Sequence, residues 1–167
     1  MISVEKLTNY VLISEERVKF SQVDPYGHLN SARYLEFMAD HRIVAAEQHL
    51  QCFTLDMLRD LSVGFAIVDA HIRFCYPSIC GELLEISSWV KSTSNQGFSL
   101  RVVIANAENR KVKAIGNLEF RSIRSSDGRP APMPDSLPSR SEHDLLSKCP
   151  TLESHLTTLK FRAGFDL

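Results

Sequence analysis

The chain has 167 residues, of which 44% are hydrophobic and 23% are charged. This length and composition are typical of a single globular domain with its own core, and they exclude a disordered chain. The 19 Lys and Arg residues against 20 Asp and Glu residues give a net charge of -1, so the chain has no global positive charge with which to bind nucleic acid. A local basic patch for an anionic small molecule remains compatible with this balance.

The cysteines and the length of the apolar runs indicate where in the cell the protein is expected. Cys52, Cys75, Cys80 and Cys149 form no C-x-x-C pair, which predicts reduced thiols rather than a zinc site or disulfides. The N-terminus is polar, and no apolar run reaches the roughly 18 residues that a membrane helix needs. We therefore expect a cytoplasmic protein that does not contact a membrane.

The first elements are a strand and a helix separated by a turn. Apolar and polar residues alternate around Val18 and Phe20, which predicts a strand with these two side chains buried. Pro and Gly in the segment 24–27 predict a turn, and Asn30 is a good helix N-cap. Residues 31–49 contain no Pro or Gly and predict one long helix, apolar on several sides and therefore buried.

The next half of the chain is predicted to be mainly strands, after a shorter helix at about 54–61. Alternating apolar residues predict four strands, at about 66–76, 84–90, 98–104 and 112–120. Short polar turns connect the last three, so we expect a meandering antiparallel sheet. One buried helix within an antiparallel sheet is an α+β architecture, and burying it on several sides requires a strongly curved sheet.

The composition changes after Gly128, where prolines become frequent. These prolines are Pro130, Pro132, Pro134 and Pro138. A segment so rich in proline forms neither a strand nor a helix, although the pattern at 141–144 favours a short helix further on. We expect residues 1–128 to form the main domain and residues 129–167 to form a Pro-rich C-terminal extension packed on it.

The chemistry is concentrated just before the long helix. Asp24, His28 and Asn30 place a carboxylate, an imidazole and an amide beside the helix N-terminus. Backbone N–H groups there can polarise a carbonyl oxygen, and a neighbouring carboxylate can attack the carbonyl carbon or activate water. The alternative is structural: Asp24 and Asn30 only cap the turn and the helix, and His28 is a surface residue. The residue types alone favour this structural interpretation.

Segment 24–30, with the sequence DPYGHLN, resembles the turn of hotdog-fold acyl-CoA thioesterases of the 4-hydroxybenzoyl-CoA thioesterase type. The passage IRFCYP at 72–77, followed by GELL at 81–84, looks like the strand–Pro–Gly–acid–strand passage of this family. The resemblance covers about residues 16–129. It implies a curved antiparallel sheet wrapped around one central helix, and hydrolysis of an acyl-CoA to a free acid and CoA without a cofactor.

The resemblance also implies roles for single residues. Asp24 matches the catalytic carboxylate of the family, which acts as a nucleophile or as a general base for water. Ser31, seven residues later, matches the position whose backbone N–H points at the thioester carbonyl. His28 is expected to orient Asp24 or bind substrate, and Asn30 to do likewise or only to cap the helix. Gly27 allows the backbone to approach the thioester closely.

Further substrate contacts are expected from a subunit interface, because the family's site lies between paired subunits of a dimer or a dimer of dimers. The second subunit is expected to contribute Gly64, Phe65 and Ala66. The other expected substrate contacts are Tyr26, Tyr34 as pocket wall, and Arg121 and Arg124 at the rim. The arginines would hold the phosphates of CoA. For Tyr34 and Phe65 the competing interpretation is core packing, and for the arginines it is an ordinary solvated surface.

Two features depart from the pattern or compete with it. Tyr26 stands where plant-type acyl-carrier-protein thioesterases have an Asn between the Asp and the His, which puts that catalytic scheme in doubt. A second branch of hotdog thioesterases uses a carboxylate within the central helix. Glu36, Asp40 and Glu47 are the candidates for that role, although charges on a packed helix are more often paired or exposed.

Other functions are weighed against the thioesterase. A hotdog hydratase or dehydratase is the less favoured enzyme, because its usual motifs are absent. A non-catalytic acyl-binding subunit would have the same fold without needing Asp24. No metal site is expected, because His41 and His49 are eight positions apart and no His pair has the i, i+4 spacing of helical zinc sites.

Overall fold

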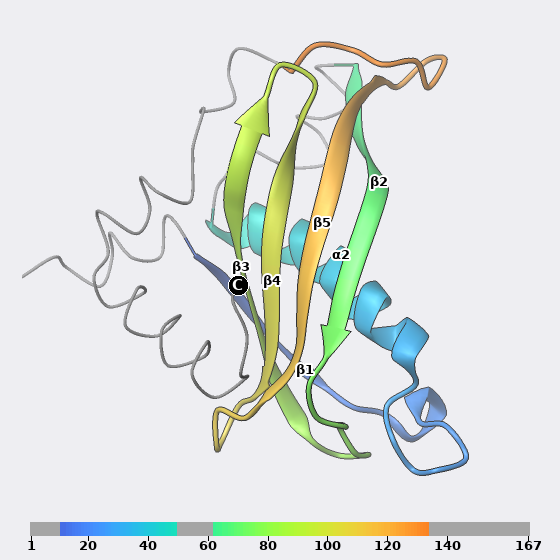
Figure 1. Cartoon of the computed structure of the whole chain (residues 1–167), viewed down its shortest axis with the longest axis vertical. Helices are drawn as coiled ribbons and strands as arrows, with labels where there is room; N and C mark the ends of the chain where they lie inside the picture. Colours follow the sequence, from blue (N-terminus) through green and yellow to red (C-terminus); the bar gives the residue numbers. More distant parts are fainter. Residues whose placement is uncertain (1–10, 50–61, 134–167) are drawn as a thin grey trace, which may run out of the picture.

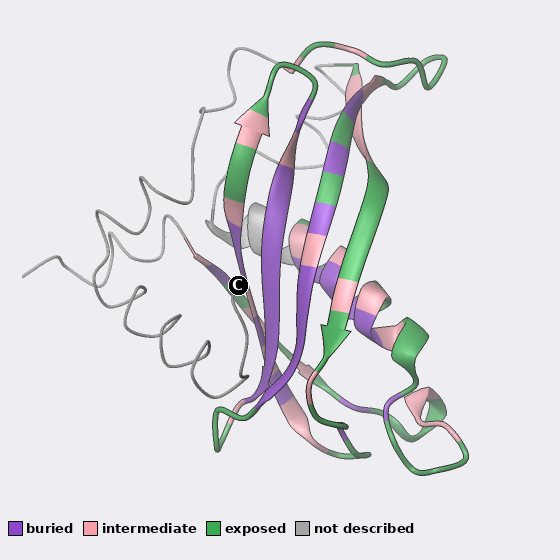
Figure 2. Cartoon of the chain, in the orientation of Figure 1, coloured by how far each residue is buried: buried purple, intermediate pink, exposed green. Residues whose placement is uncertain are grey.

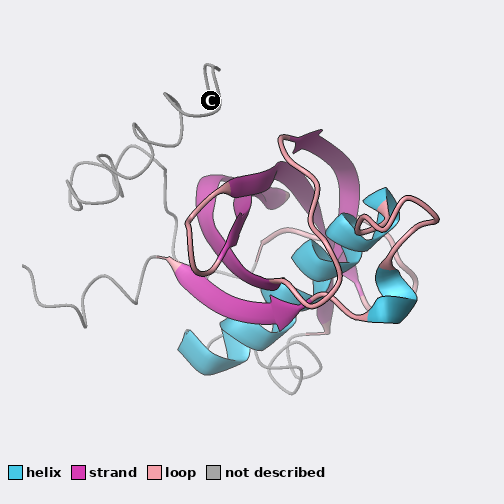
Figure 3. Ribbon diagram, turned by 90° about the horizontal axis from the view of Figure 1, so that it is seen from below, coloured by secondary structure: helices cyan, strands magenta, loops and turns pink. Residues whose placement is uncertain are grey.

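The computed structural model describes residues 11–49 and 62–133. The elements in chain order are β1 (Leu12–Arg17), a 3-10 turn η1 (Phe20–Gln22), α2 (Ser31–His49), β2 (Val63–Phe74), β3 (Leu83–Ser94), β4 (Gly97–Asn106) and β5 (Val112–Arg124). The strands form one antiparallel sheet in the order β1-β3-β4-β5-β2, which curves around α2 (Figures 1 and 3). No helix in the described ranges is both long and apolar enough to cross a membrane. The predicted helix at 54–61 lies outside these ranges.

Helix α2 spans the predicted residues. Its N-terminus is capped by Asn30, whose Oδ1 accepts a hydrogen bond of 3.0 Å from the backbone N–H of Ala32. Phe37 and Met38 are buried against the sheet, whereas Ile43 is 37% exposed on another side. The prediction that the helix is buried on several sides is therefore wrong for the side chains described, because the sheet covers only one side of it.

The first strand lies earlier in the chain than predicted. Strand β1 ends at Arg17, and although Val18 is buried, Phe20 is 84% exposed. The reason is local: the backbone N–H of Lys19 bonds to the side chain of Gln22, and the N–H of Gln22 bonds to the carbonyl oxygen of Lys19. This turn diverts the chain into η1, so the alternating pattern continues in the sequence after the strand has ended.

The sheet is only partly a meander. Strands β3, β4 and β5 follow each other as predicted, but β2 pairs with β5 and not with β3, so it forms one edge of the sheet. Figure 2 shows that β2 is largely exposed, that β4 is almost entirely buried and that β5 is buried over most of its length. A bulge between Ile67 and Asp69 interrupts the β2–β5 ladder. Helix α2 packs mainly on β1 and β3, and it contacts β2 near both ends of that strand, where Tyr34 packs on Phe74 and Arg42 donates a hydrogen bond to the carbonyl oxygen of Phe65.

Gly116 sets how closely α2 approaches the sheet. A Cβ atom at this position of β5 would lie 2.5 Å from Sδ of Met38, whose side chain is completely buried in the core. Real side chains do not approach so closely, so the helix rests on bare backbone here. The absence of a side chain at Gly116 is therefore a packing requirement.

We predict that Gly116→Val lowers the free energy of unfolding by about 1–3 kcal/mol, because the added methyl groups overpack the core. Urea denaturation followed by circular dichroism measures this loss. The double variant with Met38→Ala should recover part of it, since the side chain that clashes is shortened. Equal stability of Gly116→Val and the wild type would contradict this packing account.

The cap makes a second prediction. Asn30→Ala should lower the free energy of unfolding by about 1 kcal/mol, because the N–H of Ala32 loses its acceptor. Asn30→Asp keeps an acceptor oxygen and should be close to the wild type in the same denaturation experiment. If both variants lose stability equally, the cap is not what Asn30 contributes.

Candidate active site

The turn before α2 is folded around the carboxylate of Asp24. Its Oδ1 accepts hydrogen bonds from the backbone N–H groups of Tyr26, at 2.9 Å, and His28, at 3.1 Å. The N–H of Asp24 bonds to the carbonyl oxygen of His28 at 2.7 Å, which closes the turn. Gly27 has a φ of +78°, a conformation that strongly favours glycine. One carboxylate oxygen thus holds the turn, and Oδ2 makes no hydrogen bond within residues 11–49 and 62–133.

The helix N-terminus that follows is positive in character. The N–H of Ala32 is taken by Oδ1 of Asn30, and the N–H of Arg33 by the carbonyl oxygen of Asn30. No acceptor in the described part of the chain bonds to the N–H of Ser31. The first turn carries no acidic side chain, so nothing there neutralises the positive end of the helix dipole. Such an end is suited to stabilising a developing oxyanion.

The loop after β2 forms hydrogen bonds with the turn and with α2. Ser78, in the segment after β2, is fully buried, and its carbonyl oxygen accepts a 2.8 Å hydrogen bond from the N–H of Leu29. Its Oγ accepts a 3.1 Å hydrogen bond from the hydroxyl of Tyr34. His28 and Ile79 form an isolated antiparallel bridge. Sequence reasoning missed this contact, because the only signal for it was the Pro–Gly passage after the predicted strand.

The structure brings most of the predicted catalytic residues into this one turn. Tyr26 is 84% exposed there and His28 is exposed too, with no hydrogen bond from its ring to a described residue. Tyr34 is different: it is 3% exposed, and its ring packs edge-on against Phe74 at 5.3 Å between centroids. Burial raises the pKa of Tyr34, more than its hydrogen bond to Ser78 lowers it. Within one chain, Tyr34 therefore lies in the core.

The other predicted contacts lie far from this turn within one chain. Phe65 and Ala66 are near the start of β2, about 26 Å along the strand from its other end, where the turn lies. Ala66 pairs with Arg121 of β5. Arg124 forms a 2.9 Å ion pair with Asp127. The structure therefore splits the predicted site between the two ends of β2.

The helix carboxylates face another part of the molecule. A cavity of about 450 Å³ lies between β1 and α2, and Glu36 and Asp40 help to line it. None of the predicted site residues in segment 24–31 lines this cavity. Glu36 is ion-paired with Arg33 at 2.5 Å, and the side chain of Glu47 lies outside the described residues. Among the described residues no group of three or more His, Cys, Asp or Glu side chains is arranged to hold a metal.

The sequence itself matches known proteins. A profile of the thioesterase-like superfamily matches residues 18–140. The long-chain acyl-CoA thioesterase FadM of Escherichia coli is 26% identical over 107 residues, which covers 64% of this chain and 79% of FadM.

Solved structures share the fold. One is Slr0204, a 1,4-dihydroxy-2-naphthoyl-CoA thioesterase from Synechocystis, with a TM-score of 0.63 and 21% identity over 74% of this chain and 90% of that one. Another is SAV2348 from Staphylococcus aureus in complex with CoA, with a TM-score of 0.68 and 13% identity over 77% of this chain and 79% of that one. These likenesses confirm the expected hotdog fold. Because the superfamily profile matches most of its length, the chain belongs to the thioesterase-like superfamily.

Proposed function

We propose that this protein is an acyl-CoA thioesterase that hydrolyses an acyl-CoA to a free acid and CoA, with Asp24 as the reacting carboxylate. The observation that carries the proposal is that the two oxygens of this carboxylate have different hydrogen bonding. Oδ1 is fixed by two backbone N–H groups, while Oδ2 is left for chemistry in the turn that leads into α2. A purely structural Asx turn would also use Oδ1, so it is Oδ2 that must be tested.

The mechanism follows from these groups. Oδ2 of Asp24 removes a proton from water as the water oxygen bonds to the thioester carbonyl carbon. The carbonyl oxygen gains negative charge, which the N–H of Ser31 and the positive end of α2 stabilise. The C–S bond then breaks, and the departing CoA thiolate takes the proton from Asp24. In the nucleophilic variant, Oδ2 attacks the carbonyl carbon itself, and the C–S bond breaks to release the CoA thiolate and leave an anhydride. Water then hydrolyses the anhydride to the free acid, which restores the Asp24 carboxylate, and a proton from this water goes to the thiolate.

The substrate class is supported by the relatives. FadM and Slr0204 are named for acyl-CoA substrates, and SAV2348 was solved with CoA bound. The phosphates of CoA need cations at the rim of the site. Arg121 is exposed and forms no ion pair with a described residue, whereas Arg124 is engaged with Asp127. Arg121 is therefore the better candidate for phosphate binding.

We infer that two copies pair along β2. The edge strand and the loop after it expose large apolar side chains, which include Val68 at 54%, Phe74 at 53%, Tyr76 at 44% and Ile79 at 57%. An exposed apolar strand edge is a template for pairing with another strand, and dimers are usually related by a twofold axis. Burying this edge in a dimer removes both the apolar surface and the unpaired backbone groups from water.

Such pairing completes the site. When two β2 strands pair in antiparallel fashion, the start of one lies beside the end of the other. Phe65, Ala66 and Arg121 of one subunit are thereby brought towards the Asp24 turn of its partner. This explains why one chain separates residues that the resemblance places in a single site.

The remaining expectations concern the extension and the compartment. We infer that the Pro-rich extension packs on the domain at its start, residues 129–133. Residues 134–167, with the short helix predicted at about 141–144, lie outside the described residues. The N–H of Ala131 bonds to β5 at Ser122, and the N–H of Met133 bonds to the carbonyl oxygen of Asn95 in the β3–β4 turn. Cys75 and Cys80 are free thiols, which supports a reducing, cytoplasmic location.

We predict that Asp24→Asn reduces thiol release from acyl-CoA by about 10²–10⁴-fold, because an amide neither accepts the proton nor attacks the thioester. The amide oxygen can still accept the two hydrogen bonds that Oδ1 accepts, so the turn should stay folded. A colorimetric thiol assay over short, branched, aromatic and long acyl-CoAs measures the rate, and a thermal melt checks the fold.

The outcomes of this experiment are distinct. Asp24→Ala should lose stability as well as activity, because the turn then has no acceptor for the N–H groups of Tyr26 and His28. Equal rates in the wild type and Asp24→Asn would overturn the role of Asp24. If the wild type released no thiol from any acyl-CoA, the chain would be a non-catalytic acyl-binding subunit.

We predict that Val68→Lys converts the dimer to a monomer, because a charge in the middle of an exposed edge strand opposes pairing. Thiol release should fall with it, since the partner's share of the site is lost. Light scattering after gel filtration measures the mass. Ile13→Lys is the matched control, as Ile13 is 44% exposed on β1 at the opposite edge of the sheet. A fully active dimer of Val68→Lys would contradict pairing along β2.

A further inference from the structure

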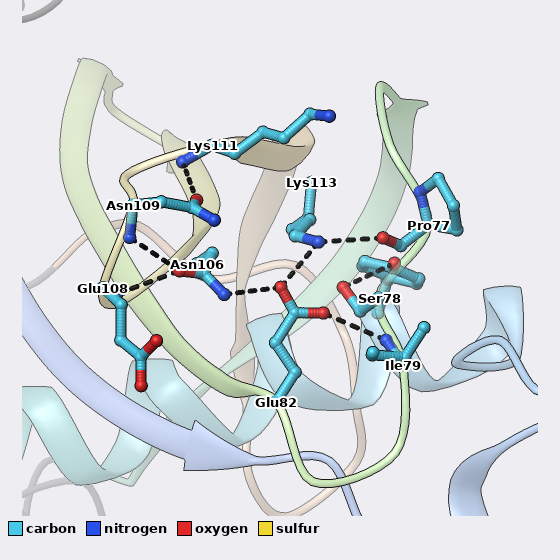
Figure 4. A network of polar contacts seen from close by, with 10 residues as sticks. Pro77, Ser78, Ile79, Glu82, Asn106, Glu108, Asn109, Lys111 and Lys113 are labelled. Atoms are coloured by element: carbon cyan, nitrogen blue, oxygen red, sulfur yellow. Dashed lines mark hydrogen bonds and ion pairs between the residues drawn. The ribbon is translucent and has the colours of Figure 1, made fainter.

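The Gly81–Glu82 passage, which the proposed mechanism does not use, leads to a buried ion pair. Glu82 lies directly before β3, and its Oε1 is 2.6 Å from Nζ of Lys113 on β5 (Figure 4). The two side chains are only 8% and 9% exposed. Burying two charges is costly unless they are paired and hydrogen-bonded, so a buried pair in a small domain calls for a specific explanation.

Two contacts of this pair reach the loop after β2, and a third reaches the end of β4. Oε1 of Glu82 also accepts a 2.7 Å hydrogen bond from Nδ2 of Asn106, at the end of β4. Oε2 accepts a 3.0 Å hydrogen bond from the backbone N–H of Ile79. Nζ of Lys113 donates a 2.9 Å hydrogen bond to the carbonyl oxygen of Pro77. The pair therefore holds the loop after β2 at Pro77 and at Ile79, which lie on either side of Ser78.

The carboxylate is ionised in this setting. Burial raises the pKa of Glu82, but the hydrogen bonds from Lys113, Asn106 and Ile79 together lower it further than burial raises it. The charge on Glu82 is thus stabilised by the contacts that fix the loop. An uncharged side chain at this position would weaken all of them together.

The residue between the two anchors is Ser78, which contacts the candidate site. Its carbonyl oxygen accepts the N–H of Leu29, and its Oγ accepts the hydroxyl of Tyr34 in the first turns of α2. The neighbouring Ile79 forms a bridge with His28, and the N–H of His28 in turn bonds to Oδ1 of Asp24. A continuous chain of hydrogen bonds and backbone pairing leads from the buried ion pair to the carboxylate.

We propose that Glu82 and Lys113 are positioning residues that, through the Pro77–Ile79 loop, hold the carboxylate of Asp24 in line with the N-terminus of α2. The proposal rests on the proposed function, because it assigns these residues to the same thioester hydrolysis. Neither residue touches the substrate. Their effect is on alignment, so it falls on the reaction step and not on acyl-CoA binding.

The test is Glu82→Gln, which keeps the size of the side chain and an acceptor for Ile79 but removes the charge. We expect kcat for thiol release to fall by about 10²-fold, as for a displaced catalytic group, while KM stays within about twofold. Glu85→Gln is the matched control. Glu85 is on β3, three residues after Glu82, and pairs with Arg110, but it makes no contact with the loop, so its variant should keep the wild-type kcat.

A second variant keeps the test decisive if Glu82→Gln folds poorly. Ser78→Ala removes only the link from the Pro77–Ile79 loop to Tyr34, and it should lower kcat by about tenfold with little change in KM. Where both single variants fold, the double variant Glu82→Gln/Ser78→Ala should be no slower than Glu82→Gln alone, because both changes release the same loop. Thermal melts establish which variants are folded.

The proposal is overturned if folded Glu82→Gln retains the wild-type kcat or, where that variant does not fold, if Ser78→Ala retains it. It is also overturned if the effects of the two changes multiply as independent changes do. A change confined to KM would also overturn it. These results are separate from the failure of the proposed function, which is decided by thiol release in the wild type and its loss in Asp24→Asn. Wild-type activity that depends on Asp24 but not on Glu82 would leave the thioesterase intact and reject the positioning pair.

Discussion

The candidate site depends on two irregular segments that satisfy each other's backbone groups. The turn before α2 and the loop after β2 are distant in the sequence, and neither has a strand ladder of its own. Leu29 donates its N–H to Ser78, and His28 forms a bridge with Ile79. Buried backbone groups must find partners, so each segment fixes the course of the other. The shape of the site is thus a property of this end of the sheet and not of the turn alone.

Helix α2 contributes both to the core and to the candidate site. Its buried side fills the sheet, with Met38 lying directly on the backbone of Gly116, while its N-terminus is kept exposed beside the turn. It packs mainly on β1 and β3, and β2 has no strand paired to its outer side in the described sheet. The exposed apolar side chains of β2 and the polar groups of the candidate site therefore lie at the same edge of the sheet.

The helices and strands themselves could be predicted better than which of them lie side by side. The helix from Ser31 to His49 follows from its N-cap and the lack of Pro and Gly, and alternation locates the strands. Alternation says nothing of which strands pair, so the edge position of β2 was missed. The alternating pattern also continues to Phe20, although the strand has already ended, because the side chain of Gln22 bonds to the N–H of Lys19 and turns the chain. These failures have one cause, which is that single contacts between distant residues override a local pattern.

The same limit applies to the candidate site. Asp24 and Asn30 could be singled out because the turn and the cap are local in sequence, and their contacts are indeed local. The pairing of Glu82 with Lys113 joins two strands and leaves no periodic signal. A glutamate before a strand looks like any surface charge until the fold shows that it is buried. Family resemblance marked the position without giving its physical role.

The bulge between Ile67 and Asp69 has a consequence for how the protein behaves at high concentration. A flat, unbroken apolar edge can recruit strand after strand and grow into a fibril. The bulge bends the edge strand at its middle, and Asp69 places a charge beside it. The shape of the edge and the charge beside it therefore disfavour open-ended aggregation.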